Sequence, residues 1–353
     1  MRFIHLADVH LGAKPEQQYS WSAKRGQEIW DTFRQVIEQA GRQQTELLLI
    51  AGDLFHGQPL LRELKEVNYL FSSIPDTRVV LIAGNHDYLR KGSPYQKFKW
   101  SSNVYFLKED RMERVEFPEI HTYVYGFSYH QQQISQERYA DVRPKEERGC
   151  HILLAHGGDS QHIPIRYGAL MQAGFTYVAL GHIHQPQILS RTPEHAMAYA
   201  GSLEPVEKHE EGPHGFFEGE WRQGQLKIRL VPAASRIYDT IECVVDEDTG
   251  QYEAEQMVRD LIEKKGAQNM YHILLGGQKS PDWEIDRERF YALGRIVDVW
   301  DKTRNAYDLD RLEEQFSGTL IGEYIHSFRG RDLTEIERKA LDYGLAALLE
   351  TRE

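Results

Sequence analysis

The sequence predicts an α/β fold with a second, smaller α/β unit toward the C-terminus. Short apolar runs alternate with helical patterns in the first half of the chain, and a separate strand–helix–strand pattern follows at 238–245, 252–265 and 270–275. Apolar runs of this length are typical of strands buried on both faces, and their alternation with helices predicts a largely parallel sheet.

Five apolar runs are the predicted strands. They occupy residues 2–7, 46–51, 79–83, 151–155 and 177–180, and helical patterns at 22–42 and 60–73 separate the early ones. A hairpin-like region follows at 197–200, 215–220 and 226–231, and the tail from residue 308 is helical. We expect domains at 1–235, 236–310 and 311–353.

Composition excludes several classes of protein. The chain has 353 residues, of which 41% are hydrophobic and 27% are charged. Its net charge is −12, which excludes a protein that binds nucleic acid through a generally basic surface. The two cysteines, Cys150 and Cys243, support neither a disulfide framework nor a zinc ribbon. His5, Asp8 and His10 interrupt the first apolar stretch, which excludes a signal-peptide core. We expect a cytoplasmic, nucleoid-associated protein with no membrane span.

Each predicted strand ends in a polar cluster. The side chains of these clusters that can bind a metal are Asp8, His10, Asp53, Asn85, His156, His182 and His184. Because ligands gather at the carboxyl ends of parallel strands, we expect them to meet at one edge of the sheet. Oxygen and imidazole donors without thiolate suit manganese, iron or zinc, and the share of oxygen favours manganese. Two divalent metals would use this many donors, clamping an in-line displacement at phosphorus.

These clusters, in this order, resemble the calcineurin-like metallophosphoesterases. The segments 8–12 (DVHLG), 52–56 (GDLFH) and 201–204 (GSLE) are similar to those of SbcD-type DNA double-strand-break nucleases, and the overall match is closest to the YhaO branch. The resemblance implies an α+β sandwich whose sheet layers are flanked by helices, with a smaller C-terminal α/β cap domain that contacts DNA.

The resemblance also implies a role for each residue. One metal would bind to Asp8, His10, Asp53 and His184. The other would bind to Asp53, Asn85, His156 and His182, with Asp53 bridging. The remaining three residues are catalytic candidates: His86 over the phosphate, His56 steering the DNA or His86, and Asp87 orienting His86. Two alternatives stay open, because Asp87 could instead cap the following helix and His56 could be a surface-loop histidine.

The implied activity is two-metal-dependent hydrolysis of DNA phosphodiester bonds. The family precedent is a 3′-to-5′ exonuclease and single-strand endonuclease in DNA repair, working as a homodimer and as the catalytic subunit of a complex with an SMC-like coiled-coil ATPase of the SbcC type. Two other functions stay open: a small-molecule phosphodiesterase or phosphatase, and a non-catalytic DNA-binding subunit with a structural metal site. The second domain argues against the former, and His86 argues against the latter.

Residues 88–100 (YLRKGSPYQKFKW) interleave basic and aromatic side chains directly after the predicted catalytic loop. The basic residues are Arg90, Lys91, Lys97 and Lys99. Basic groups meet phosphates and aromatic rings stack on bases, so the segment is a candidate DNA-binding strip. The alternative is a solvated helix whose aromatic side chains belong to the core.

The C-terminal tail carries one apolar stripe on a predicted helix. Its members are Leu333, Ile336, Ala340, Leu341, Leu345, Leu348 and Leu349. Asp332 and Glu335 are placed to cap this helix. The stripe either packs on its own domain or docks to the ATPase partner.

Overall fold

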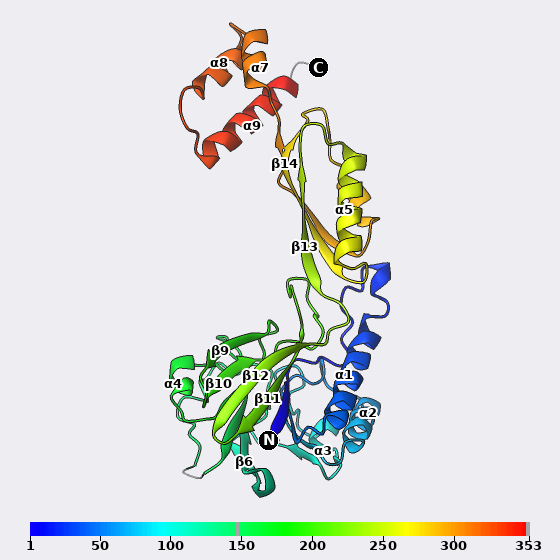
Figure 1. Ribbon diagram of the computed structural model, residues 1–353, viewed down its shortest axis with the longest axis vertical. Helices are drawn as coiled ribbons and strands as arrows, with labels where there is room; N and C mark the ends of the chain where they lie inside the picture. Colours follow the sequence, from blue (N-terminus) through cyan, green and yellow to red (C-terminus); the bar gives the residue numbers. More distant parts are fainter. Residues whose placement is uncertain (146–147, 351–353) are drawn as a thin grey trace. The chain divides into compact units, whose positions relative to one another are not determined.

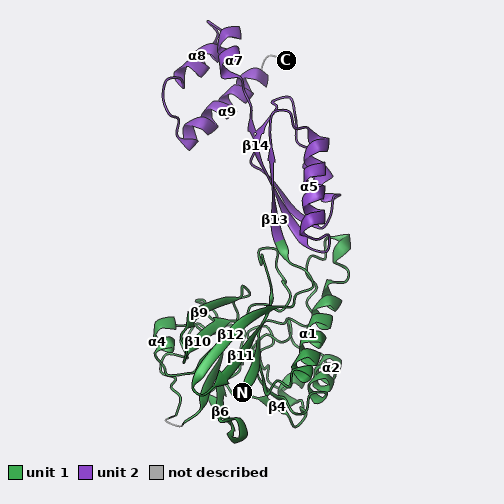
Figure 2. Ribbon diagram, in the orientation of Figure 1, with its two compact units in different colours: residues 1–238 green, residues 239–353 purple. Residues whose placement is uncertain are grey.

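The computed structural model describes residues 1–145 and 148–350. The chain divides into two compact units, Met1–Tyr238 and Asp239–Glu353 (Figure 2). The division falls three residues after the predicted boundary at 235. The assignment of a nuclease domain, a cap domain and C-terminal helices as separate domains stays a prediction.

The first unit is built on two mixed sheets that pack face to face (Figure 1). One has the order β12-β11-β1-β2-β3-β4, formed by Gln225–Pro232, Gly215–Arg222, Arg2–Leu6, Leu47–Ala51, Arg78–Ile82 and Val104–Phe106. The other has the order β5-β6-β7-β8-β10-β9, formed by Glu113–Phe117, Thr122–Gly126, Cys150–His156, Tyr177–Gly181, Ala196–Tyr199 and Gln187–Arg191. The expected α/β sandwich is confirmed, but the five predicted strands are shared between two sheets.

Parallel pairing places the ends of these strands together. β1, β2, β3 and β4 run parallel in the first sheet, and β6, β7, β8 and β10 run parallel in the second. β11 and β12 join the first sheet antiparallel, and β5 and β9 flank the second in the same way. The carboxyl ends of β1, β2 and β3 therefore belong to one sheet, and those of β7 and β8 to the other.

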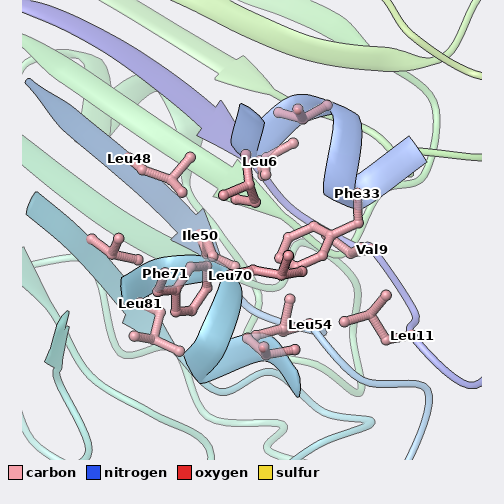
Figure 3. Packing of buried hydrophobic residues seen from close by; sticks show 14 of the residues in the cluster. Leu6, Val9, Leu11, Phe33, Leu48, Ile50, Leu54, Leu70, Phe71 and Leu81 are labelled. Carbon is pink, nitrogen blue, oxygen red and sulfur yellow. The ribbon is translucent and has the colours of Figure 1, made fainter. Parts of the chain in front are cut away.

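Three apolar clusters stabilise this unit. The inner faces of both sheets form one cluster, in which Phe3, Leu49 and Val80 are buried with Ile152 and Ala179. A second lies between the first sheet and the helices α1 (Arg25–Arg42) and α2 (Leu61–Ser72), as Figure 3 shows for Leu48, Ile50, Phe33 and Phe71. The third covers the outer face of the second sheet with α4 (Tyr167–Met171) and loop residues. Short helices η1 (Ser20–Ser22), α3 (Pro94–Lys97) and η2 (Pro118–Ile120) complete the unit.

The second unit begins within β13 (Tyr238–Val245), which pairs next to β14 (Met270–Lys279) and β15 (Ile296–Asp301) in one sheet, with β16 (Arg304–Asn305) on β14. Helix α5 (Gln251–Lys265) buries Ala254, Val258 and Ile262 against this sheet, with α6 (Arg287–Tyr291) alongside. This matches the predicted strand–helix–strand pattern to within a few residues at each boundary.

The C-terminal helices α7 (Leu309–Gln315), α8 (Leu320–Ser327) and α9 (Glu335–Glu350) share a small cluster of their own. Within the predicted stripe, Leu341 and Leu345 are buried, whereas Ile336 is 80% exposed. The predicted cap is wrong by two residues: the backbone N–H of Thr334 donates to Glu337, and the N–H of Glu337 donates to Oγ1 of Thr334. No helix in the described ranges is both long and apolar enough to cross a bilayer.

Candidate metal centre

The seven predicted donors converge where the two sheets meet. Within the described residues, groups of ligand atoms within 4.8 Å of one another include Asp8, His10 and His184, and also Asp8, Asp53 and His156. Asn85 joins the second group through its Oδ1, which lies 2.8 Å from Nε2 of His156 and 3.1 Å from Nδ1 of His182. The seven donors thus form one continuous cluster.

The carboxylate that the two groups share is not the one expected from the resemblance. Asp8 is common to both groups, whereas the resemblance gives the bridging place to Asp53. Which carboxylate bridges, and which metal each histidine binds, stay predictions.

The strand ends adopt backbone conformations that few side chains accept. Asp8, His10 and Asp53 have φ angles of 49°, 51° and 50°, in the left-handed region. Such conformations cost about 1–3 kcal/mol each and concentrate at functional sites. All three side chains on these turns are buried.

Glycines beside these residues allow the close approach. A Cβ on Gly84 would lie 2.7 Å from the backbone nitrogen of Asp53, and one on Gly52 would lie 2.8 Å from Cγ of His156. A Cβ on Gly181 would lie 2.9 Å from Nδ1 of His156. The glycines that precede Asp53, Asn85 and His182 are therefore required by packing against the neighbouring cluster.

The surroundings of the two buried carboxylates shift their pKa values in opposite directions. Burial raises the pKa of Asp8 to about 6, even though His156 and His184 act in the opposite direction. Burial would raise the pKa of Asp53 as well, but the imidazoles of His156, His10 and His86 hold it well below its usual range. Oδ2 of Asp53 is buried and has no hydrogen-bond donor among the described residues. An ionised carboxylate oxygen left in this way fits a cation.

The imidazoles are arranged as ligands. Nε2 of His10 and Nε2 of His184 face each other at 3.0 Å. Burial holds the pKa of His10 well below its usual value, so its ring is neutral and offers a lone pair. Nδ1 of His156 lies 2.9 Å from the carbonyl oxygen of Ala51, which leaves Nε2 toward Asn85 and Asp53. Carboxylate, amide and imidazole donors of this kind fit one or two divalent metals.

His86 lies beside the cluster and not within the predicted ligand set. Its backbone N–H donates to Oδ1 of Asp53 at 2.9 Å, and its Nδ1 lies 3.2 Å from the carbonyl oxygen of His56. Its ring packs edge-on against His10, with centroids 4.8 Å apart, and stacks on His56. His56 therefore positions His86 through a backbone oxygen, and Nδ1 of His56 lies 3.4 Å from Nδ1 of His10.

The carboxylate of Asp87 bonds to backbone N–H groups of two turns and does not cap the following helix. Its carboxylate accepts the backbone N–H of Gly84 at 2.8 Å and that of Phe55 at 3.2 Å, and it is fully buried. The next helix, α3, is capped instead by the side chain of Ser93. Asp87 ties the turn that carries Asn85 and His86 to the turn that carries Asp53, because its two oxygens accept from one backbone N–H of each turn.

The basic and aromatic residues that follow the turn of Asn85 and His86 lie in different environments. Arg90, Lys91, Lys97 and Lys99 are exposed. Tyr95 is fully buried, and Phe98 and Trp100 pack against the apolar cluster beneath α1 and α2. These three rings belong to the core and are not a stacking platform. Phosphate binding by the four cations stays a prediction.

Two acidic residues at the site were missed in the sequence. Oδ2 of Asp159 lies 2.8 Å from Nε2 of His182 and 2.9 Å from Nδ1 of His162. Oε1 of Glu210 lies 2.7 Å from Nδ1 of His184. Burial would lower the pKa of His184, but Glu210 and Asp8 raise it to about 9. Asp159 follows His156 closely and could have been suspected, whereas Glu210 lies in an acidic stretch with no recognisable spacing.

Comparisons with known proteins agree with this geometry. The profile of the family described as calcineurin-like phosphoesterase matches residues 1–186. The chain is 27% identical to the "Uncharacterized metallophosphoesterase YhaO" of Bacillus subtilis, over 90% of this chain and 86% of that protein. It is 29% identical to the "DNA double-strand break repair protein Mre11" of Saccharolobus solfataricus, over 79% and 76% of the two chains. It is 26% identical to the protein of the same name from Sulfurisphaera tokodaii, over 93% and 87%.

Proposed function

Because this chain belongs to the calcineurin-like phosphoesterase family, we propose that it is a DNA nuclease of that family. As a member it is a metal-dependent phosphodiesterase. The observation that carries the proposal is the convergence of the predicted donors, with His86 beside them, at the strand ends of the two sheets. DNA as substrate is supported by the relatives named Mre11, whose names describe them as DNA double-strand break repair proteins.

The ligands of the proposed site are Asp8, His10, Asp53, Asn85, His156, His182 and His184. Bound divalent cations would supply positive charge to the phosphoryl oxygens and lower the pKa of a water molecule. We propose manganese, because oxygen donors make up much of the set. The described residues supply the complementary features: an ionised carboxylate at Asp53, a neutral imidazole at His10 and burial of both side chains.

His86 acts on the substrate itself. The carbonyl oxygen of His56 accepts from Nδ1–H of His86 and fixes the direction of the ring. In the imidazolium form, the Nε2–H of His86 donates to an oxygen of the phosphate and then transfers its proton to the leaving oxygen of the DNA strand. Asp87 contributes by holding the turn on which His86 lies.

The finer parts of the proposal come from the family resemblance. We propose 3′-to-5′ exonuclease and single-strand endonuclease activity, a role in DNA repair, a homodimer, and an SMC-like coiled-coil ATPase as partner. The second unit would then also contact DNA. Arg90, Lys91, Lys97 and Lys99 would bind phosphates of the incoming strand.

Substrate choice can be tested on the purified chain. We expect manganese-dependent cleavage of end-labelled single- and double-stranded DNA, compared in the same buffer with a generic aryl phosphodiester. Removal of the metal with EDTA should abolish both reactions. If the aryl phosphodiester is cleaved while all DNA stays intact, the protein is a small-molecule phosphodiesterase and the nuclease proposal is wrong.

A further inference from the structure

Glu210 lies in a segment without any sequence motif, yet its carboxylate reaches the proposed metal centre. The residue is only 2% exposed, and its Oε1 lies 2.7 Å from Nδ1 of His184. On the other side of the same imidazole, Nε2 faces Nε2 of His10 at 3.0 Å. One edge of the His184 ring is thus held by a carboxylate while the other edge points into the site.

We propose that Glu210 is the positioning residue that fixes the orientation and tautomer of His184 for metal binding. An imidazole that donates Nδ1–H to a carboxylate keeps its Nε2 lone pair for a metal, and the carboxylate makes that nitrogen more basic. This inference rests on the metal-dependent part of the proposed function and is independent of the substrate.

The carboxylate of Glu210 is itself locked in place by its other contacts. Oε1 accepts the backbone N–H of Glu207 at 3.1 Å, and Oε2 accepts that of Val206 at 3.0 Å. Oε2 also accepts from Oγ of Ser202 at 2.7 Å. With both oxygens occupied by fixed donors, the carboxylate cannot rotate away, and His184 is held to one direction.

The network continues one residue further into the protein. Nδ1 of His214, which is fully buried, lies 2.9 Å from Oγ of Ser202. Since Ser202 donates its own hydrogen to Glu210, it accepts from Nδ1–H of His214. His214 therefore donates to Ser202, and both Ser202 and His184 donate to the carboxylate of Glu210, which further restricts Glu210.

The neighbouring histidine has a weaker version of this arrangement. Nε2 of His182 lies 2.8 Å from Oδ2 of Asp159, but the Asp159 side chain is 46% exposed and shared with His162. Water competes for an exposed carboxylate, so Asp159 restrains its histidine less than Glu210 does. The two carboxylates thus form an internal comparison within one site.

The test uses the full chain, stripped of metal with EDTA and titrated with Mn²⁺ alone by calorimetry and electron paramagnetic resonance. Glu210→Gln keeps the size of the side chain and an acceptor oxygen but removes the charge. We expect it to weaken Mn²⁺ binding by about 10–100-fold. Ser202→Ala is the matched control, because it removes a donor to the same carboxylate and leaves the contact with His184; its loss should be smaller.

Two results would overturn the inference. One is Mn²⁺ affinity of folded Glu210→Gln equal to that of the wild type. The other is an equal loss in Ser202→Ala, because the effect would then belong to the fold of the loop. A wild type that binds no Mn²⁺ would instead overturn the proposed function, and this inference with it.

A second measurement needs no variant at position 210, in case Glu210→Gln does not fold. Nitrogen-15 spectra of histidine-labelled wild-type protein with Zn²⁺ report which ring nitrogen carries the proton, and His184→Gln assigns the signal. We expect a protonated, hydrogen-bonded Nδ1 and a Zn²⁺-shifted Nε2. Zn²⁺ on Nδ1 would contradict the proposal.

Discussion

At the scale of single residues, the proposed centre depends on buried polar groups that are satisfied by the backbone of a neighbouring turn. Asp87 is the clearest case, since one of its oxygens accepts an N–H group from the turn after β3 and the other accepts one from the turn after β2. Burial and the nearby charge of Asp53 raise its pKa to about 7. Asp87 therefore connects the turn that carries Asp53 to the turn that carries His86.

Asp87→Asn tests this role. The amide keeps one acceptor oxygen, so one of the two buried N–H groups loses its partner, which costs about 1–3 kcal/mol. We expect that loss in the free energy of unfolding, measured by urea denaturation in EDTA. The control is Asp159→Asn, at a side chain that is 46% exposed. An unchanged stability for Asp87→Asn would show that the two bonds are not required.

Residue types and order were sufficient to predict the ligand candidates, because each follows directly on a strand. The contacts of Asp87, Asp159 and Glu210 could not be predicted in the same way. Glu210 reaches His184 because of how residues 202–210 fold, and no spacing of residues in the sequence predicts this contact. Asp87 is adjacent to His86 in sequence, but the backbone turns its carboxylate toward Gly84 and Phe55.

At the scale of elements, the strand-to-loop turns must approach each other more closely than any side chain permits. Gly84→Ala would place a methyl group against the backbone of Asp53 and the ring of His156. We expect the metal content of this variant, measured by mass spectrometry of the purified protein, to fall well below that of the wild type.

The control for this substitution is Gly168→Ala in α4. An added Cβ there meets nothing within 4 Å, and alanine is favoured over glycine in a helix by about 1 kcal/mol. Gly168→Ala should keep the wild-type metal content. Full metal content in Gly84→Ala would mean that the turns can separate without loss of the site.

The exposed cations after β3 give a prediction about DNA. Lys97 and Lys99 are exposed, while the ring of Phe98 between them packs against the apolar core. Replacing both lysines by alanine should weaken DNA binding and reduce its salt dependence, by about 0.9 in the log–log slope for each lost phosphate contact on duplex DNA. Binding would be measured by fluorescence anisotropy across a range of salt concentrations.

Arg222 and Lys227, both exposed on the hairpin of β11 and β12, provide a control with the same change in charge. Their replacement by alanine should leave the slope closer to that of the wild type. If the salt dependence of DNA binding has the same slope in both double variants, residues 88–100 are not part of the DNA-binding surface.

The elements themselves were largely predictable, and the sheet assignment was not. Continuous apolar runs such as Leu47–Ala51 identify buried strands because both faces are covered. The same pattern cannot say whether the cover is a helix or a second sheet. The sequence pattern of β7 and β8 is therefore the same as that of the strands in the first sheet, although they form the second sheet with β6 and β10.

At the scale of the whole molecule, each compact unit has apolar clusters of its own. The proposed metal ligands all belong to Met1–Tyr238, whereas Asp239–Glu353 has separate clusters on its sheet and among its C-terminal helices. The chain should therefore unfold in two calorimetric transitions.

Mn²⁺ should move only one of these transitions. A ligand present at 100 times its dissociation constant stabilises the folded state by about 2.7 kcal/mol, so the transition of the first unit should rise in temperature. Scanning calorimetry with Mn²⁺ and with EDTA measures this shift, and Na⁺ at matched ionic strength is the control. A shift of both transitions, or of neither, would contradict the placement of the metals in the first unit alone.

The most direct test of the central claim compares the wild type with His86→Ala on end-labelled DNA in the presence of Mn²⁺, with the metal content of both proteins measured in parallel. We predict that the wild type degrades DNA and that His86→Ala keeps its metals while losing about 10²–10⁴-fold in rate, because the acid that serves the leaving oxygen is gone. Cleavage by His86→Ala at the wild-type rate, or intact DNA with a metal-loaded wild type, would contradict the account.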